Sequence, residues 1–456
     1  RPSLSPNMIH LPEAFISQTK SLLGLEETEA LIKALSEEAP TSIRVNPNKA
    51  TAISGECVPW CETGYYLSER PSFTLDPLFH AGAYYVQEAS SMFLSQVIKA
   101  LPEEPRRVLD LCAAPGGKST LWRAELPEQT LLVANEPIHR RAMILAENLA
   151  KWGHPDVIVT EDYPKSFSHL PGCFDVIAAD VPCSGEGMFR KDSGAIDEWS
   201  KENVDFCAQR QFEIISDVWP ALREGGFLVY STCTFNRAEN EDNIERICRE
   251  LGAETLPIPI KEEWKIRGSL TKDSLHVYHF FPHYTRGEGI FFALLRKTSA
   301  TAPEKKSKGR PELVSQQLAR QLSAWVDAKE PLAFLLSDNN MVQGVKEDFL
   351  SIAWQIKKQI KTVRTGINIA EIKGKKLIPQ PDLALSTIVS PESFPKVVLN
   401  YEQAIAYLRH EALNLDTTER GYLLATYEDR NLGFLNNLGS RANNLYPSEW
   451  RIRKQC

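Results

Sequence analysis

The fold of this chain is decided by the stretch VLDLCAAPGGKST, residues 108–120. It begins as an apolar run typical of a buried strand and passes through two glycines into a segment with helical periodicity. Glycines at a strand-to-helix turn let a ligand approach the backbone, and the following helix N-terminus offers free N–H groups and a positive dipole end. The stretch therefore predicts a βα unit whose turn binds an anion, either a phosphate or a carboxylate.

The same alternation of apolar runs and helical-period segments continues from Arg106 to Arg296, which predicts an α/β fold with a mostly parallel sheet. Two later runs, residues 275–281 and 290–295, are joined by a Gly-containing turn and predict an antiparallel hairpin at the edge of that sheet. The expected parallel strands are Val108–Leu111, Leu131–Ala134, Val157–Val159, Phe174–Ala179 and Gly226–Tyr230.

Composition divides the rest of the chain. The first hundred residues mix amphipathic helices with Pro-punctuated extended segments, which predicts an α+β module. A stretch rich in Lys, Ser, Pro and Gly after the sheet predicts a linker. The predicted division is an N-terminal module over 1–104, the sheet domain over 105–298, the linker over 299–311, a middle module over 312–385 and a β-rich C-terminal region over 386–456.

Charge and hydropathy limit the class of protein. The net charge of −7 argues against a surface wholly wrapped in nucleic acid. No apolar stretch is long enough to cross a bilayer, and residues 1–10 lack the pattern of a signal peptide. Nine cysteines, an odd number without C-x-x-C spacing, fit a reducing compartment, so we expect a cytoplasmic protein with no membrane partner.

Basic residues are concentrated in two places near the end of the chain. A solvated face and an RNA-facing surface are equally good interpretations of either cluster. The first cluster holds Lys357, Lys358, Lys361, Arg364, Lys373, Lys375 and Lys376, and the second holds Arg441, Arg451, Arg453 and Lys454.

Three acidic residues follow successive strands and indicate the ligand. Glu136 lies about twenty residues beyond the glycine turn, where such sheets place an acid against ribose hydroxyls. The turn matches neither the nucleoside-triphosphate loop nor the full dinucleotide fingerprint. We therefore expect S-adenosylmethionine, with its carboxylate at the helix N-terminus, Asp162 near the adenine and Asp180 near the reacting end. In the alternative interpretation Glu136 supports the next helix and Asp162 only a turn.

Two cysteines occupy polar loops that directly follow strand-like runs, Cys183 in DVPCSGEG (180–187) and Cys233 in STCT (231–234). Both thiols should reach the same sheet edge. Carbon 5 of cytosine becomes nucleophilic only after a thiolate adds to carbon 6, and a second group is needed to release the product. Asp180 could hold the amino group and ring nitrogen of the base. Such a base must be unstacked or single-stranded.

The remaining cysteines and one histidine group are expected to be structural. His276, His279 and His283 fall on a strand-like segment whose spacing puts them on different faces, so no metal site is predicted. Buried, inert thiols are expected for Cys57, Cys61, Cys173, Cys207, Cys248 and Cys456.

Together these motifs resemble the Sun/nucleolar-protein family of RNA cytosine-C5 methyltransferases. The resemblance rests on residues 110–118, Pro182-Cys183 and Thr232-Cys233-Thr234, with similar flanking pieces at 42–46, 86–92, 282–283 and 287–289. It implies a class I Rossmann-like methyltransferase sheet, Cys233 as nucleophile and Cys183 as the residue that assists release. It also implies that S-adenosylmethionine is held by Cys112, Ala113, Ala114, Pro115, Gly116, Gly117, Lys118, Glu136, Asp162 and Asp180.

The end of the chain, residues 443–453, looks like the PUA-like RNA-binding tail of the F type of bacterial 16S ribosomal RNA methyltransferases. This likeness implies ribosomal RNA or the small ribosomal subunit as partner, with methylation near the decoding centre. Val181 departs from the small residue common in its loop.

Other assignments remain open from the residues alone. DNA cytosine methyltransferases attack with the cysteine of a Pro-Cys loop, which would make Cys183 the nucleophile. Transfer RNA or large-subunit RNA could be the substrate, and a non-catalytic ribosome-assembly factor could use the same fold to bind RNA. A dehydrogenase is disfavoured, because the third fingerprint glycine is missing.

Overall fold

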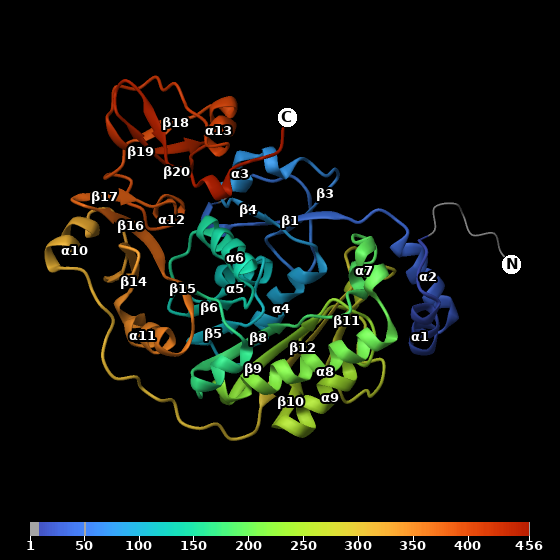
Figure 1. The fold of residues 1–456 in the computed structure, drawn as a ribbon. Helices are drawn as coiled ribbons and strands as arrows, with labels where there is room; N and C mark the ends of the chain where they lie inside the picture. The colour runs from blue at the N-terminus through green and yellow to red at the C-terminus, as the bar shows by residue number, and fades with distance from the viewer. Residues whose placement is uncertain (1–8, 50–51, 456) are drawn as a thin grey trace.

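The computed structural model describes residues 9–49 and 52–455, and its centre is a mixed sheet in the order β10-β12-β9-β8-β5-β6-β7-β15, with β11 paired to β12 (Figure 1). Its parallel part confirms the five predicted strands and the α/β class. The bounds are β5 Arg107–Asp110, β6 Leu131–Asn135, β7 Val157–Thr160, β8 Phe174–Asp180 and β9 Leu222–Thr232.

One end of the sheet is antiparallel. Strand β12 (Ile290–Lys297) pairs with β9, with β10 (Ala253–Leu256) and with β11 (Tyr278–Phe280), which confirms the predicted hairpin. Nearly every residue of β12 is buried, because helices or loops cover both faces of the sheet.

Helices cover both faces of the parallel strands. On one face, α8 buries Ile215 beside Leu109 and Ile177. On the other face, α5 and α6 bury Leu121 and Leu145 beside the remaining strand residues. The order of strands and helices places the carboxyl ends of β5 to β9 at one edge. The helices here are α5 Gly117–Glu125, α6 His139–Trp152, α7 Ser193–Glu198, α8 Lys201–Val218 and α9 Glu241–Arg246.

The N-terminal module is α+β, as predicted, with a small antiparallel sheet in the order β2-β3-β1-β4. Its helix α1 contacts the sheet domain, since the Phe15 ring packs edge-on against two of its rings. The distance between ring centroids is 5.1 Å to Phe189 and 5.7 Å to Trp199. The elements are α1 Glu13–Leu23, α2 Leu25–Leu35, β1 Thr41–Val45, β2 Glu56–Cys57, β3 Gly64–Leu67, α3 Pro77–His80, β4 Tyr84–Val86 and α4 Leu94–Lys99.

Residues beyond the predicted linker contribute one strand to the central sheet. Strand β15 (Thr362–Thr365) pairs antiparallel with β7, a pairing that the sequence did not indicate. It is short and has Arg364 in its middle, so it lacks an apolar pattern. Arg364 is buried, 3.2 Å from Asp382, and therefore belongs to neither a solvated nor an RNA-facing surface.

The rest of this region forms a second antiparallel sheet, β13-β14-β16-β17. The segment before it contacts the sheet domain, where Arg107 pairs with Glu304 at 2.7 Å. It also contacts the helix over residues 350–359, whose Trp354 indole donates to the Lys308 carbonyl at 3.0 Å. The elements are α10 Gln316–Ser323, β13 Leu332–Leu336, β14 Met341–Lys346, α11 Leu350–Gln359, β16 Ile367–Lys373, β17 Lys376–Pro379 and α12 Pro381–Leu385.

The C-terminal residues form a β-rich body with the strand order β18-β19-β20-β21, at the top of Figure 1. One helix, over residues 401–408, packs with these strands, and Asn400 and Gln403 form a capping box at its start. The elements are β18 Lys396–Val398, α13 Tyr401–Leu408, β19 Gly421–Tyr427, β20 Arg430–Asn437 and β21 Ala442–Asn444. Within the described ranges, no helix has the length and apolar character that a membrane span requires.

Candidate active site

The two cysteine loops lie side by side. Strands β8 and β9 are parallel neighbours, and their register puts Asp180 opposite Ser231, so the loops that follow them start at the same level. The Cys233 backbone N–H points at the Cys183 sulfur, with 3.4 Å between N and Sγ. Both thiols are partly exposed. The structure therefore brings together the two cysteines that the sequence singled out.

A buried carboxylate from each loop binds the backbone of the other loop. Glu186, in the Cys183 loop, accepts hydrogen bonds from the backbone N–H groups of Phe235 at 3.0 Å and Asn236 at 3.1 Å. Glu239, in the Cys233 loop, accepts from the backbone N–H of Ser184 at 2.9 Å. Both carboxylates are fully buried, and together they form a reciprocal clamp that fixes one thiol against the other.

Further donors complete the clamp. The Trp199 indole donates to Glu186 at 2.9 Å, and Gln211 donates to Glu239 at 2.9 Å. The Gly187 N–H donates to the Cys233 carbonyl at 2.8 Å. A Cβ on Gly187 would stand 2.5 Å from the Gly289 carbonyl oxygen and 2.9 Å from that of Cys233, so this approach requires glycine.

Sequence reasoning missed both clamp residues. Glu186 lies three residues after Cys183, and Glu239 lies six residues after Cys233. A carboxylate beside a strand end was the signal available, but sequence spacing does not show which loop it faces.

The pKa values of Cys183 and Glu239 are both raised in the folded protein. The adjacent Cys233 thiol and burial together raise the pKa of Cys183 well above its ordinary value. Burial, reinforced by the negative charge of Glu186, raises the pKa of Glu239 to about 7. Cys183 is therefore held as a protonated thiol at neutral pH.

Asp180 ends β8 beside the cysteines and is about one-third exposed. It accepts a hydrogen bond from Ser231 Oγ at 2.8 Å and pairs with Lys118 Nζ at 3.0 Å. Burial alone would lower the pKa of Lys118, but Asp180, Asp110 and Cys233 raise it overall. Lys118 is thus a fixed cation whose charge reaches both Asp180 and the Cys233 thiol.

The predicted cofactor turn joins β5 to α5. Gly116 adopts a φ of 124°, a conformation that favours glycine, and α5 begins at the next residue. Asn135, at the end of β6, binds the Leu111 carbonyl at 3.1 Å and the Asp162 carbonyl at 2.9 Å, which ties three strand ends together. Asn135 was not identified from the sequence. Burial and neighbouring carboxylates, Asp110 first, raise the pKa of Cys112, so this thiol stays protonated.

The two outer acids of the predicted set have partners of their own. Glu136 is buried, accepts from the Ile138 N–H at 2.9 Å and lies 3.3 Å from the Arg141 guanidinium. Asp162 accepts from Ser166 Oγ at 2.6 Å and from the Lys361 N–H at 3.0 Å. These contacts belong to the alternative in which Glu136 supports the next helix and Asp162 a turn. They leave each carboxylate at the edge where a ribose and an adenine would lie.

The donor set fits S-adenosylmethionine. The α5 N-terminus offers N–H groups and a positive dipole end for the amino-acid carboxylate. Gly116 and Gly117 let side chains pack closely against this turn, since a Cβ on either would lie only 3.3 to 3.4 Å from its neighbours. Glu136 and Asp162 supply acceptors for hydroxyl and amino groups.

The histidines and other cysteines lie outside this cluster. His279 is buried with Nε2 3.1 Å from Glu241, and His283 lies 3.5 Å from Glu27. No group of three or more His, Cys, Asp or Glu side chains in the described part of the chain could hold a metal ion. Cys61, Cys173 and Cys207 are buried as expected and Cys248 is partly buried, whereas Cys57 is exposed, which makes the expectation of burial wrong for it. Cys456 lies outside the described residues.

Family models match three parts of this chain. Residues 97–296 match the family described as 16S rRNA methyltransferase RsmB/F. Residues 11–89 match the N-terminal domain of 16S rRNA methyltransferase RsmF, and residues 394–452 match the methyltransferase RsmF PUA domain. Along the chain, the three matches cover the N-terminal module, the sheet domain and the C-terminal body in turn.

Curated relatives match over almost the full length. Ribosomal RNA small subunit methyltransferase F of Aliivibrio fischeri is 31% identical, over 97% of this chain and 98% of the relative. The protein of the same name from Escherichia coli O127:H6 is 32% identical, over 98% of both chains.

Solved structures share the fold. A methyltransferase homologue protein from Pyrococcus horikoshii has a TM-score of 0.55 and 26% identity, over 64% of this chain and 100% of that chain. NSun6 from Pyrococcus horikoshii, solved with SFG, has a TM-score of 0.55 and 22% identity, over 63% of this chain and 98% of that chain. At that identity the NSun6 likeness supports the fold alone.

Proposed function

The chain belongs to the RsmB/F family of 16S rRNA methyltransferases, and we propose that its two cysteine loops methylate carbon 5 of a cytosine in 16S ribosomal RNA. The observation that carries the proposal is the pair of adjacent thiols at the carboxyl edge of a methyltransferase sheet. The cofactor is S-adenosylmethionine. When bound, it supplies a methyl group on a positively charged sulfur atom.

Cys233 acts as the nucleophile in this proposal. Its thiolate adds to carbon 6 of the cytosine, so that electron density accumulates at carbon 5. Two features support the choice of Cys233 over Cys183. The raised pKa of Cys183 keeps its proton on the sulfur, and the Lys118 cation interacts electrostatically with Cys233 and not only with Asp180. In the proposed reaction, that positive charge would offset the negative charge of the attacking sulfur.

Asp180 orients the base. Its carboxylate is partly open and is already held by Ser231 and Lys118, so it can accept from the cytosine amino group without reorganising. Carbon 5 then takes the methyl group while carbon 6 stays bonded to sulfur.

Release completes the reaction. A base removes the proton from carbon 5, the electron pair re-forms the double bond to carbon 6, and the carbon–sulfur bond breaks to return Cys233 to a thiolate. We assign the assistance of this step to Cys183, because its sulfur lies beside the Cys233 backbone. The target cytosine must be unpaired or flipped, since stacked bases do not expose this carbon.

The substrate and its compartment are part of the same proposal. The curated relatives are named for the small ribosomal subunit RNA, and they are bacterial. We place the methylated cytosine near the decoding centre and the enzyme in the cytoplasm, and we assign the cofactor to residues 112–118 with Glu136, Asp162 and Asp180. We also keep the predicted division of the chain at residues 104, 298, 311 and 385.

The test is the transfer of labelled methyl from S-adenosylmethionine to 16S RNA, free and in small subunits, with the modified base mapped. We expect 5-methylcytosine from the wild-type protein and none from Cys233→Ala. The Cys183→Ala variant should instead accumulate a covalent protein–RNA adduct on a denaturing gel. The matched control is Cys57→Ala, an exposed cysteine on β2 that should behave as wild type.

Two results would overturn the proposal. An adduct from Cys233→Ala but not from Cys183→Ala would reverse the roles of the cysteines. RNA binding without methyl transfer to any ribosomal or transfer RNA, with cofactor binding intact, would indicate an assembly factor.

A further inference from the structure

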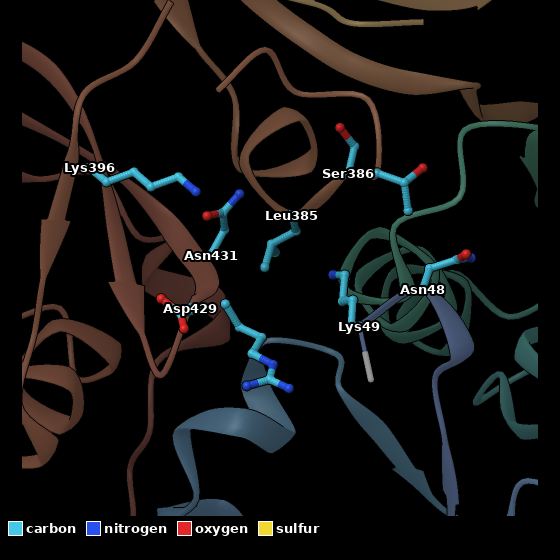
Figure 2. Close-up of a pocket in the computed structure, with 9 residues that line it drawn as sticks. Asn48, Lys49, Leu385, Ser386, Lys396, Asp429 and Asn431 are labelled. Carbon is cyan, nitrogen blue, oxygen red and sulfur yellow. The ribbon is translucent and has the colours of Figure 1, made fainter. Parts of the chain in front are cut away.

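A cavity of about 650 Å³ lies where three parts of the chain meet (Figure 2). One wall is the short helix Pro47–Lys49 of the N-terminal module, a second is the segment after α12, and a third is the C-terminal body. The cavity contains none of the residues of the cysteine loops or the cofactor turn. It is lined by Asn48, Lys49, Leu385, Ser386, Thr387, Lys396, Asp429, Arg430 and Asn431.

Lys49 is a partly buried cation with no counter-ion in the described part of the chain. Its ammonium donates to the backbone carbonyls of Ala81 at 2.9 Å and Lys151 at 2.6 Å, and no carboxylate of the described residues pairs with it. Burial lowers its pKa to about 7. Buried charges in proteins are ordinarily paired, so this ammonium would be stabilised by an anion arriving in the cavity.

A second cation reaches the same space from the opposite wall. Lys396, on β18, is exposed, and its side chain extends toward the cavity in Figure 2. Arg430 lies on that wall as well, at the start of β20. Asp429 is the one carboxylate among the residues that line the cavity. The lining thus has an excess of positive charge, together with neutral hydroxyl and amide donors.

The walls are held in place by backbone contacts. The Thr387 N–H donates to the Gly153 carbonyl at 2.9 Å, and a Cβ on Gly153 would stand 2.4 Å from the Leu385 carbonyl oxygen. The Asn431 amide donates to the Ala384 carbonyl at 3.0 Å. These contacts join the segment after α12 to the sheet domain and to the C-terminal body, and the Lys49 bonds to the Ala81 and Lys151 carbonyls hold the third wall, so the walls are in place before any ligand binds.

The chemistry of the lining favours a phosphate over a base. No aromatic ring lines the cavity, so a nucleobase would find nothing to stack on. Lysine ammonium groups with amide and hydroxyl donors are the partners that proteins use for phosphate oxygens. The N-terminal module also contacts the cofactor turn, where Arg44 donates to the Gly117 carbonyl at 2.8 Å.

We propose that this cavity binds a phosphodiester of the RNA substrate, at a point separate from the cytosine that is methylated. The proposal rests on the proposed function for the presence of RNA and goes beyond it in assigning a second contact. Lys49 and Lys396 bind the phosphate from opposite walls of the cavity. The contact orients the RNA across the N-terminal module and the C-terminal body, and it contributes affinity without reading sequence.

The primary test uses Lys396→Ala, because this side chain is exposed and its loss should leave the fold intact. The matched control is Lys33→Ala, an exposed lysine on α2 outside the cavity. RNA affinity of the full-length protein is measured as a function of salt concentration. We expect Lys396→Ala to lower the slope of log affinity against log salt by about 0.7 to 0.9, the effect of losing one phosphate contact. Lys33→Ala should keep the wild-type slope, and cofactor affinity should stay unchanged in both.

Lys49 is tested without a substitution, because replacing it would also remove its two bonds to backbone carbonyls. Acetylation of lysines on the intact wild-type protein, read by mass spectrometry, should show Lys49 and Lys396 protected when RNA is bound, and Lys33 unprotected. Inorganic phosphate alone is titrated in parallel and should compete weakly with RNA.

An unchanged salt slope in Lys396→Ala, or acetylation of Lys49 and Lys396 that RNA does not affect, would overturn the inference. Phosphate that binds without displacing RNA would also overturn it, because the cavity would then hold a free anion. These readouts do not depend on methyl transfer. A wild-type protein that binds RNA but fails to methylate it would contradict the proposed function. The salt dependence and the acetylation pattern would still test the cavity.

Discussion

The cysteine loops and the remote cavity differ in the partners that they give to buried ionisable groups. In the loops, each carboxylate of the clamp receives several hydrogen bonds from backbone and side chains, so its oxygens have their partners within the protein. In the cavity, Lys49 has only carbonyl partners in the described residues. A satisfied group fixes geometry, whereas a charge without a counter-ion favours a ligand. The difference separates a site built to hold two thiols from one built to receive an anion.

The largest expected effect comes from removing one side of the clamp. Glu186→Ala leaves the Phe235 and Asn236 N–H groups and the Trp199 indole without an acceptor, and it should lower the free energy of unfolding by about 3 to 5 kcal/mol. Urea denaturation measures this loss. Glu186→Gln keeps one acceptor oxygen and should lose less. Equal stability of Glu186→Ala and wild type would mean that the loops are fixed by other contacts.

The second prediction concerns pH and Glu239. Its pKa rises from about 4.5 when unfolded to about 7 when folded, so its favourable contribution is fully present below pH 4.5 and is lost as pH rises through 7. The loss is on the order of 3 kcal/mol. Glu239→Gln cannot titrate, so its unfolding free energy relative to wild type should increase between pH 5 and pH 8. A difference that does not vary over this range would show that Glu239 is not protonated in the folded protein.

A smaller effect is expected where the loops touch. The new methyl group of Gly187→Ala would meet two backbone oxygens, which should cost about 1 to 3 kcal/mol and separate the thiols. Methyl transfer should fall more than cofactor affinity does. The control is Gly268→Ala, where a Cβ meets nothing within 4 Å. Full methyl transfer by Gly187→Ala would show that the thiols need not be this close.

The smallest effect should come from the cavity. Lys49→Met removes a charge that has no counter-ion in the described structure, and water entering the cavity can bind the two freed carbonyls. We expect the free energy of unfolding to change by about 1 kcal/mol or less. Thermal unfolding monitored by circular dichroism measures it. A loss as large as that of Glu186→Ala would make Lys49 a structural clamp and remove the contrast between the two regions.

Much of the sheet could be predicted because its signals are local. Each parallel strand is a short apolar run next to a helical segment, and the carboxyl ends of such strands share one edge. Cys183, Cys233, Asp180 and the cofactor turn were found in this way. Strand β15 was missed, because it pairs with a strand some two hundred residues away and carries a buried arginine in place of an apolar pattern.

The sequence by itself determined the class of fold, the family and the residues at the strand ends, since apolar periodicity and short motifs are properties of neighbouring residues. Only the tertiary structure decided that Glu186 and Glu239 clamp each other's loops, that Arg364 is buried, and that Lys49 faces Lys396 across a cavity. The physical reason is that burial and pairing of charge depend on which distant segments pack together. Local sequence does not encode those distances.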